Sequence, residues 1–316
     1  MPQPIRAFLG AIFILMLVLS AGGVLTYIFR KLFADFGQRL GPNRVGPVGV
    51  LQFVADGIKL LTKEDIIPAT AETWGFRLAP YLTFIPALIA FSPIPFGGGV
   101  VVTDVRVGLI LIFAFAALAP LGEIVAGWAS NNKYAMLGGL RAAAMDISYE
   151  IPLLISAVAV ILLAGTAQTS EIVSGQAGLW YVVLQPLGLF TFLVAMIGKI
   201  GVIPFDLPEA ESELVAGYIT EYSGMRFAFF FLTLFANVFF IAALTVTLYF
   251  GGGHGPLLPP LLWFLIKTAL LSFLVFWIWN SLPRVRIDQF LNINWKILFP
   301  LSLVNLAITG AIAGGI

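Results

Sequence analysis

Hydrophobic residues in this chain are gathered into long runs that short polar segments separate. A run of about 20 apolar residues is long enough to cross a membrane as a helix, which satisfies its own backbone hydrogen bonds in lipid. The pattern predicts an all-α polytopic membrane protein that forms a single integral membrane domain over residues 1–316. Its eight transmembrane helices are expected near residues 7–29, 78–97, 107–127, 147–166, 181–203, 226–249, 258–280 and 297–315.

Composition agrees with this pattern and excludes an ordinary soluble domain. The chain is 60% hydrophobic, 10% charged, and has a mean hydropathy of +1.00. Its first apolar run ends in Arg30 and Lys31 rather than in a small-residue cleavage site, so we expect a retained helix and no cleavable signal peptide.

The distribution of basic residues predicts the orientation. Most of the 17 Lys and Arg residues lie in the first, third, fifth and seventh loops or at their borders, whereas the opposite side carries only Arg6 and Arg106. By the positive-inside rule, the odd loops face the cytoplasm and both termini face the other side. Most of the 16 acidic residues lie in the same odd loops, so the recognisable chemistry is on one face.

Val50 to Glu64, in the first loop, has the spacing of an amphipathic helix. Apolar residues hold one face, and polar residues recur on another at i, i+4, i+7 and i+11. We expect this helix to lie in the membrane interface, where it could also cover a site shared with a docked partner. The polar positions are Gln52, Asp56, Lys59 and Lys63.

Acidic residues cluster in the fifth loop, which is unusual beside a membrane. Asp206, Glu209, Glu211 and Glu213 lie within eight residues, and Glu221 follows shortly after. Asp206 and Glu209 are spaced like a helix-capping pair, which suits the helix dipole. Capping leaves the other three acids unexplained. Like charges this dense raise one another's pKa, so a proton or charge relay is the alternative.

Further titratable residues lie at or inside the predicted membrane boundary. Glu123 is near the end of the third span, and Asp146 and Glu150 lie four residues apart at the head of the fourth. Glu150 is expected either to take part in charge transfer or to pair with Arg141. Lys267, inside the seventh span, is expected to snorkel or to pair with Glu123, with a role in a proton path as the sharper hypothesis.

Absent residue types limit the redox chemistry. The chain has no cysteine and one histidine, His254, so it holds no Cys-ligated iron–sulfur cluster and no bis-histidine haem. It has no Gly-rich phosphate-binding fingerprint, and we predict no metal or flavin site. If the protein belongs to a redox system, a partner or a diffusible carrier brings the electrons.

Six ordered blocks resemble the first membrane subunit of respiratory complex I across almost the whole chain. They fall in the expected loops of an eight-helix protein. The blocks are Gln38 to Pro47, Ala55 to Glu64, Gly127 to Tyr134, Ser148-Tyr149-Glu150, Pro204 to Gly224, and Pro283 to Gln289.

This resemblance implies a multi-pass subunit of the inner membrane of a prokaryotic cell, or of a thylakoid or organelle equivalent. It joins the membrane arm to the peripheral redox arm, and it forms with its partners the chamber where quinone is reduced. Partners would be the quinone-site and iron–sulfur subunits of the peripheral arm and the small and antiporter-like membrane subunits. No catalytic residue is expected in this chain alone. Chamber or docking residues would be Arg30, Gln38, Arg39, Asp56, Lys59, Arg284 and Arg286. Proton-coupling residues would be Asp206, Glu209, Glu211, Glu213, Glu221, Glu150, Tyr149, Asp146, Glu123 and Lys267.

The chain departs from the family pattern where carboxylates are common. Phe29, Lys199 and Leu234 occupy such positions. Either the proton route runs through Glu123, Asp146 and Lys267, or the complex is a relative driven by deazaflavin, ferredoxin or hydrogen. A structural anchor for the peripheral arm is a further alternative. A secondary transporter working alone is disfavoured, because the sequence has no evident internal repeat.

Overall fold

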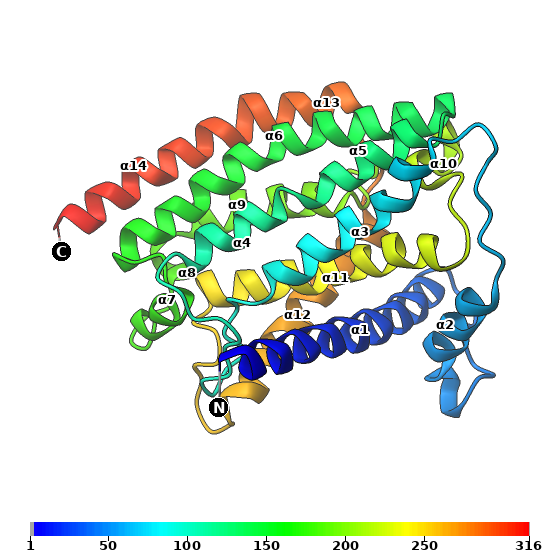
Figure 1. Cartoon of the computed structure of the whole chain (residues 1–316). Helices are drawn as coiled ribbons and strands as arrows, with labels where there is room; N and C mark the ends of the chain where they lie inside the picture. The colour runs from blue at the N-terminus through cyan, green and yellow to red at the C-terminus, as the bar shows by residue number, and fades with distance from the viewer. Residues whose placement is uncertain (1–2, 316) are drawn as a thin grey trace.

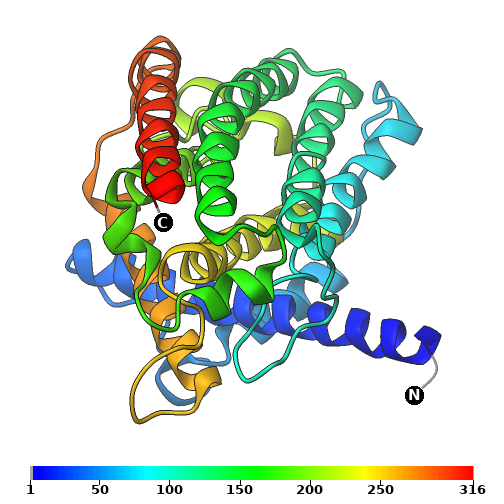
Figure 2. The same ribbon diagram turned by 90° about the vertical axis from the view of Figure 1, so that its left-hand side faces the viewer.

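The computed structural model of the chain describes residues 3–315, apart from the side chains at positions 3, 4, 6, 7, 211 and 315. In this part of the chain all regular structure is helical, with no strand. Helices run side by side in a bundle, and α2 and α10 lie near one end of it (Figures 1 and 2). Both ends of the chain lie toward the other end, on the left of Figure 1.

The first third of the chain contains the long helix α1 (Gln3–Phe36), the shorter α2 (Gln52–Thr62) and α3 (Thr73–Ala90). Glu72 caps α3, because its carboxylate accepts hydrogen bonds from the backbone N–H groups of Trp74 and Gly75. Helix α2 forms within Val50 to Glu64, the segment that was predicted to be amphipathic. None of its residues is buried within the chain. Its position in the membrane interface stays a prediction.

The predicted third span is two helices, α4 (Gly108–Ala116) and α5 (Ala119–Ala129). Pro120 explains the break, because a proline has no N–H to donate to the carbonyl of Ala116 four residues earlier.

Helix α6 (Lys133–Ala164) begins well before the predicted start at residue 147. The side chain of Asn132 accepts a hydrogen bond from the N–H of Tyr134 and caps the helix. Hydropathy missed this first part because it carries polar residues and extends beyond the apolar run. At the other end, Gly165 closes the helix with a φ of 68°.

The remainder of the chain forms short helices around α11, which packs against α1, α3 and α12 near the centre of the bundle. A π-helical segment, Asn294–Leu298, joins α13 to α14. The bounds are α7 (Thr169–Gly175), α8 (Tyr181–Leu184), α9 (Pro186–Ile200), α10 (Glu211–Leu214), α11 (Gly224–Tyr249), α12 (Pro260–Ser281), α13 (Ile287–Ile293) and α14 (Phe299–Gly315), with 3₁₀ turns at Pro47–Gly49 and Gly217–Ile219.

Six helical stretches among the described residues are long and apolar enough to cross a membrane. They correspond to α1, α4 with α5, α6, α11, α12, and α13 with α14. The other two predicted spans correspond to α3, of 18 residues, and α9, of 15 residues, which pack inside the same bundle. An integral multi-pass fold is thus supported, and the number of eight crossings remains a prediction.

Candidate functional site

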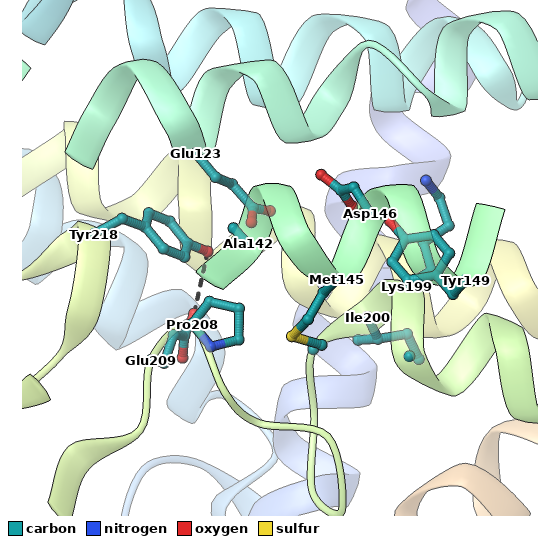
Figure 3. Close-up of a pocket in the computed structure, with 12 residues that line it drawn as sticks. Glu123, Ala142, Met145, Asp146, Tyr149, Lys199, Ile200, Pro208, Glu209 and Tyr218 are labelled. Atoms are coloured by element: carbon teal, nitrogen blue, oxygen red, sulfur yellow. Dashed lines mark hydrogen bonds between the residues drawn. The ribbon is translucent and has the colours of Figure 1, made fainter. Parts of the chain in front are cut away.

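A small polar cavity lies where α5, α6 and α9 meet the acidic loop that follows α9. Its volume is about 20 Å³, measured for the centre of a water-sized sphere, which is enough for one water. The polar side chains that line it come from four separate parts of the chain (Figure 3). They are Glu123, Asp146, Tyr149, Lys199, Glu209 and Tyr218.

Two glycines let the acidic loop lie directly on α6. A Cβ on Gly138 would lie 2.7 Å from the backbone nitrogen of Tyr218 and 2.8 Å from the carbonyl oxygen of Pro208. A Cβ on Gly217, which has a φ of 54°, would lie only 1.8 Å from the same carbonyl oxygen. Backbone therefore meets backbone here, and this contact brings Glu209 and Tyr218 to the residues of α6.

Asp146 lies at the centre of the polar side chains. Its Oδ1 accepts a hydrogen bond from the Tyr149 hydroxyl, one turn further along α6. Its Oδ2 is buried without a hydrogen-bond partner among the described residues. In Figure 3 the side chains of Glu123, Asp146 and Lys199 follow one another along α6. Glu123, Asp146 and Lys199 thus line the same cavity.

Lys199 enters the cavity from the end of α9. Its Nζ donates a hydrogen bond of 2.7 Å to the carbonyl oxygen of Ala116, at the break between α4 and α5. The ammonium also lies 5.7 Å from the centre of the Tyr149 ring. The resemblance to the complex I subunit leads us to expect a carboxylate at this position, whereas this chain has a positive charge among its acids.

Tyr218 connects the acidic loop to the cavity. Its hydroxyl donates a hydrogen bond of 3.2 Å to Oε1 of Glu209. Burial raises the pKa of the Tyr218 phenol well above its ordinary value, and the nearby carboxyl groups of Glu123 and Glu209 raise it further. The phenol therefore stays neutral and remains a hydrogen-bond donor at physiological pH.

The other loop acids have partners outside the cavity, and this corrects the expectation of capping. No helix begins at residue 207, and α10, which begins at Glu211, has no side-chain cap. Asp206 forms an ion pair with Arg284 instead, and Arg284 also donates to the hydroxyl of Ser212 at 3.1 Å.

The acidic side chains of this loop have more partners than the sequence indicated. Glu213 forms an ion pair of 2.5 Å with Arg141 from α6, so Arg141 is not the partner of Glu150. Glu221 accepts a hydrogen bond of 2.6 Å from the amide of Asn132. The side chain of Glu211 lies outside the described part of the chain.

Glu150 and Lys267 lie outside the cavity. Glu150 lines a separate, mainly apolar pocket of about 250 Å³ between α4 and α6. Lys267 was expected to snorkel or to pair with Glu123, and the pairing is wrong. Its Nζ donates to the carbonyl oxygens of Phe250, Gly252 and His254 at 2.6, 3.1 and 2.6 Å. Three carbonyls of the loop after α11 satisfy all three ammonium donors, which explains why no carboxylate is needed.

A larger apolar pocket, of about 510 Å³, lies between α1, α2 and the start of α11. Arg30, Asp56 and Lys59 are its charged lining residues. Arg30 forms an ion pair with Asp56 that joins α1 to α2, and Lys59 lies 3.6 Å from the same carboxylate. Three of the expected chamber residues are therefore brought together. The apolar lining includes Leu19, Phe53, Leu60, Phe227, Phe231 and Leu232.

The remaining predicted chamber residues are more dispersed. The guanidinium of Arg39 lies 5.2 Å from the ring of Phe33, in a smaller neighbouring pocket that Arg30 also lines. Gln38 is exposed, with a φ of 50°. Arg286 is exposed and lies near Asp288. Their roles stay predictions.

Two of the six polar side chains that line the cavity were not among the predicted site residues, namely Lys199 and Tyr218. Lys199 was noted only as a departure from the family pattern, although a lysine inside a predicted span is itself a signal. Tyr218 lies in the Pro204 to Gly224 block, but spacing alone does not indicate that its hydroxyl returns to Glu209.

Comparison with known proteins shows the family to which this chain belongs. A sequence model described as NADH dehydrogenase matches residues 9–310. The H 1 subunit of NADH-quinone oxidoreductase from Geobacter metallireducens is 46% identical over 306 residues, which cover 94% of this chain and 93% of the relative. The H subunit of the Dehalococcoides mccartyi enzyme is 46% identical over 286 residues (90% and 81%), and the H 2 subunit of the Cereibacter sphaeroides enzyme is 45% identical over 308 residues (97% of each). The chain therefore belongs to the NADH dehydrogenase family of membrane subunits.

Proposed function

We propose that this chain is the H subunit of a complex I-type, proton-translocating quinone oxidoreductase. The names of its relatives support this assignment, and the matches cover nearly the full length of both chains. Because the chain has no cysteine, it holds no Cys-ligated iron–sulfur cluster. We assign the clusters and the flavin of such a complex to the partner subunits of the peripheral arm. Antiporter-like and small membrane subunits are its partners in the membrane. The assembly lies in the inner membrane of a prokaryotic cell or its equivalent, with the termini on the non-cytoplasmic side.

The pocket between α1, α2 and α11 is the proposed route by which quinone reaches the reduction chamber. Its apolar walls suit an isoprenoid tail, and Arg30, Asp56 and Lys59 place charges beside it. Quinone is the substrate. It takes two electrons from the partner that holds the last cluster and two protons, and it leaves as quinol.

The acidic cavity is the proposed start of the proton-coupling route. Reduction of quinone changes the charge near the acidic loop. Glu209 belongs to this loop and is linked to the cavity by the hydrogen bond that it accepts from Tyr218. Glu123 and Asp146 then lie on the far side of the same cavity. A shift in protonation among these groups is the local event that would bias the partner subunits. The meeting of five titratable side chains and Lys199 in one cavity is the observation that carries this proposal.

Glutamine substitution of Glu123 and of Glu209, which both line the cavity, tests the proposal in membranes that hold the assembled complex. Each variant should lose quinone reduction, or keep it while pumping fewer protons per electron. Glu171→Gln is the matched control, because Glu171 lies on α7, where it accepts a hydrogen bond from Thr166, away from both sites. Unchanged turnover and pumping in both acid variants would refute the coupling role and favour a structural anchor for the peripheral arm.

A relative driven by deazaflavin, ferredoxin or hydrogen is the second candidate. Lys199 favours it, since a cation lies where the complex I resemblance leads us to expect a carboxylate. Mass spectrometry of the subunits that co-purify separates the two candidates. A flavin-bearing NADH module supports the first, and a complex purified without that module supports the second.

A further inference from the structure

Lys199 lies between the break that separates α4 from α5 and the polar cavity, and its hydrogen bond at the break does not explain why the residue is charged. Pro120 leaves the Ala116 carbonyl without its helical donor, and the Lys199 ammonium replaces that donor at 2.7 Å. A neutral donor would serve this purpose equally well. Placing a full positive charge in a polar cavity inside the bundle is costly unless that charge has partners.

The partners are acids on two neighbouring helices. Lys199 interacts electrostatically with Asp146, Glu150 and Glu123. Among these acids, Asp146 has the strongest electrostatic interaction with Lys199. The Oδ2 atom of Asp146 is buried and has no hydrogen bond among the described residues. Other titratable groups around the cavity are Tyr149 on α6 and, from the loop side, Glu209 and Tyr218.

We propose that Lys199 is a positioning residue that acts as the internal counter-charge of Asp146 and Glu123 and is held in place by the Ala116 carbonyl. The inference rests on the proposed proton-coupling function of the cavity. It adds that the resident cation sets the pH range over which the two carboxyl groups change protonation. It also adds that the α4–α5 break exists at the point where this cation must be anchored.

Three variants separate the charge from the hydrogen bond. Lys199→Met removes both, and Lys199→Arg keeps both. Pro120→Ala combined with Lys199→Met supplies a backbone N–H for the Ala116 carbonyl and still lacks the charge. The measurement is the pH profile of quinone reduction by the assembled complex in membranes. A short-chain quinone is the acceptor, and the donor is the one that the co-purified subunits identify.

Lys199→Met should move the midpoint of the profile to higher pH by about one unit, because the carboxyl groups lose a neighbouring cation that favours their ionised form. Adding Pro120→Ala to Lys199→Met should not bring the midpoint back to that of the parent complex. Lys199→Arg should keep the midpoint near that of the parent. In an Asp146→Asn background, Lys199→Met should move the midpoint by less than half as much.

An unmoved midpoint in Lys199→Met, or its return through Pro120→Ala, would show that Lys199 serves only the helix break, and the inference would be overturned. This failure differs from failure of the proposed function. In that second case the parent complex itself would reduce no quinone, or the Glu123→Gln and Glu209→Gln variants would work normally.

Discussion

Replacing Lys267 by Met should loosen the loop after α11 without stopping proton transfer. The ammonium holds three carbonyl oxygens between Phe250 and His254, and it lies 4.3 Å from the centre of the Trp180 ring. Met retains most of the apolar length of the side chain but none of the three donors. The loop therefore loses the group on which its carbonyls converge.

The magnitude follows from these contacts. A hydrogen bond to a charged group contributes about 1.5–3 kcal/mol, and an ammonium over an indole about 0.5–2 kcal/mol. Water can replace part of each at the end of the bundle, so we expect opening of the loop to become easier by roughly 3 kcal/mol. Since 1.4 kcal/mol is a factor of ten, this corresponds to about 100-fold faster exchange of protected amides.

Hydrogen exchange read by mass spectrometry on the detergent-solubilised complex measures this effect. The informative amides are those of Gly251, Gly252 and His254, which donate to Gln176 Oε1, Val246 O and Gly251 O at 2.9 Å each. Lys267→Arg is the matched control and should show a smaller change. The Gly97–Gly99 loop serves as an internal reference. Unchanged exchange together with lost pumping would refute the reasoning and return Lys267 to the proton path.

Three further predictions concern the two pockets. Gly138→Val should displace the acidic loop and lower the thermal stability of the complex by about 1–3 kcal/mol, because its side chain would overlap the backbone of Tyr218. Gly178→Val is the matched control and should leave the stability unchanged, because a Cβ at this exposed loop position meets nothing within 4 Å. Equal losses in the two variants would contradict the close contact. Tyr218→Phe should slow coupled turnover about tenfold through loss of the bond to Glu209, equally from about pH 6 to 9 because the phenol stays neutral there; a loss confined to one end of this range would contradict the raised pKa. Ala228→Trp should fill the pocket between α1, α2 and α11 and raise the apparent KM for quinone several-fold with little change in assembly, as measured by steady-state kinetics; an unchanged KM would place the quinone route elsewhere.

Hydropathy predicted the all-helical class and the position of every long helix, because the apolar runs report directly on membrane crossing. It located the ends of helices less well. The start of α6 at Lys133 depends on the Asn132 cap, and the break at Pro120 depends on one missing N–H. Neither changes the average hydropathy of its window.

The candidate site was predictable as a set of residues and less so as a set of contacts. Charge clustering indicated Asp206 to Glu213, and the family resemblance indicated Arg30, Asp56 and Lys59. Sequence separation concealed which base meets which acid. Glu213 pairs with Arg141, 72 residues away, and Asp206 pairs with Arg284, 78 residues away. Such pairings depend on how the helices pack, which a single sequence does not contain.

The close contact between Gly138 and Gly217 has a mechanical consequence. No side chain lies between the two backbones to deform, so the acidic loop and α6 must move as one rigid body. Helix α6 has 32 residues, and at a rise of about 1.5 Å per residue it extends roughly 48 Å. A displacement of the acidic loop is therefore expected to reach the turns of α6 around Gly138 directly and to extend along the helix as far as Pro152, where the proline removes one helical hydrogen bond.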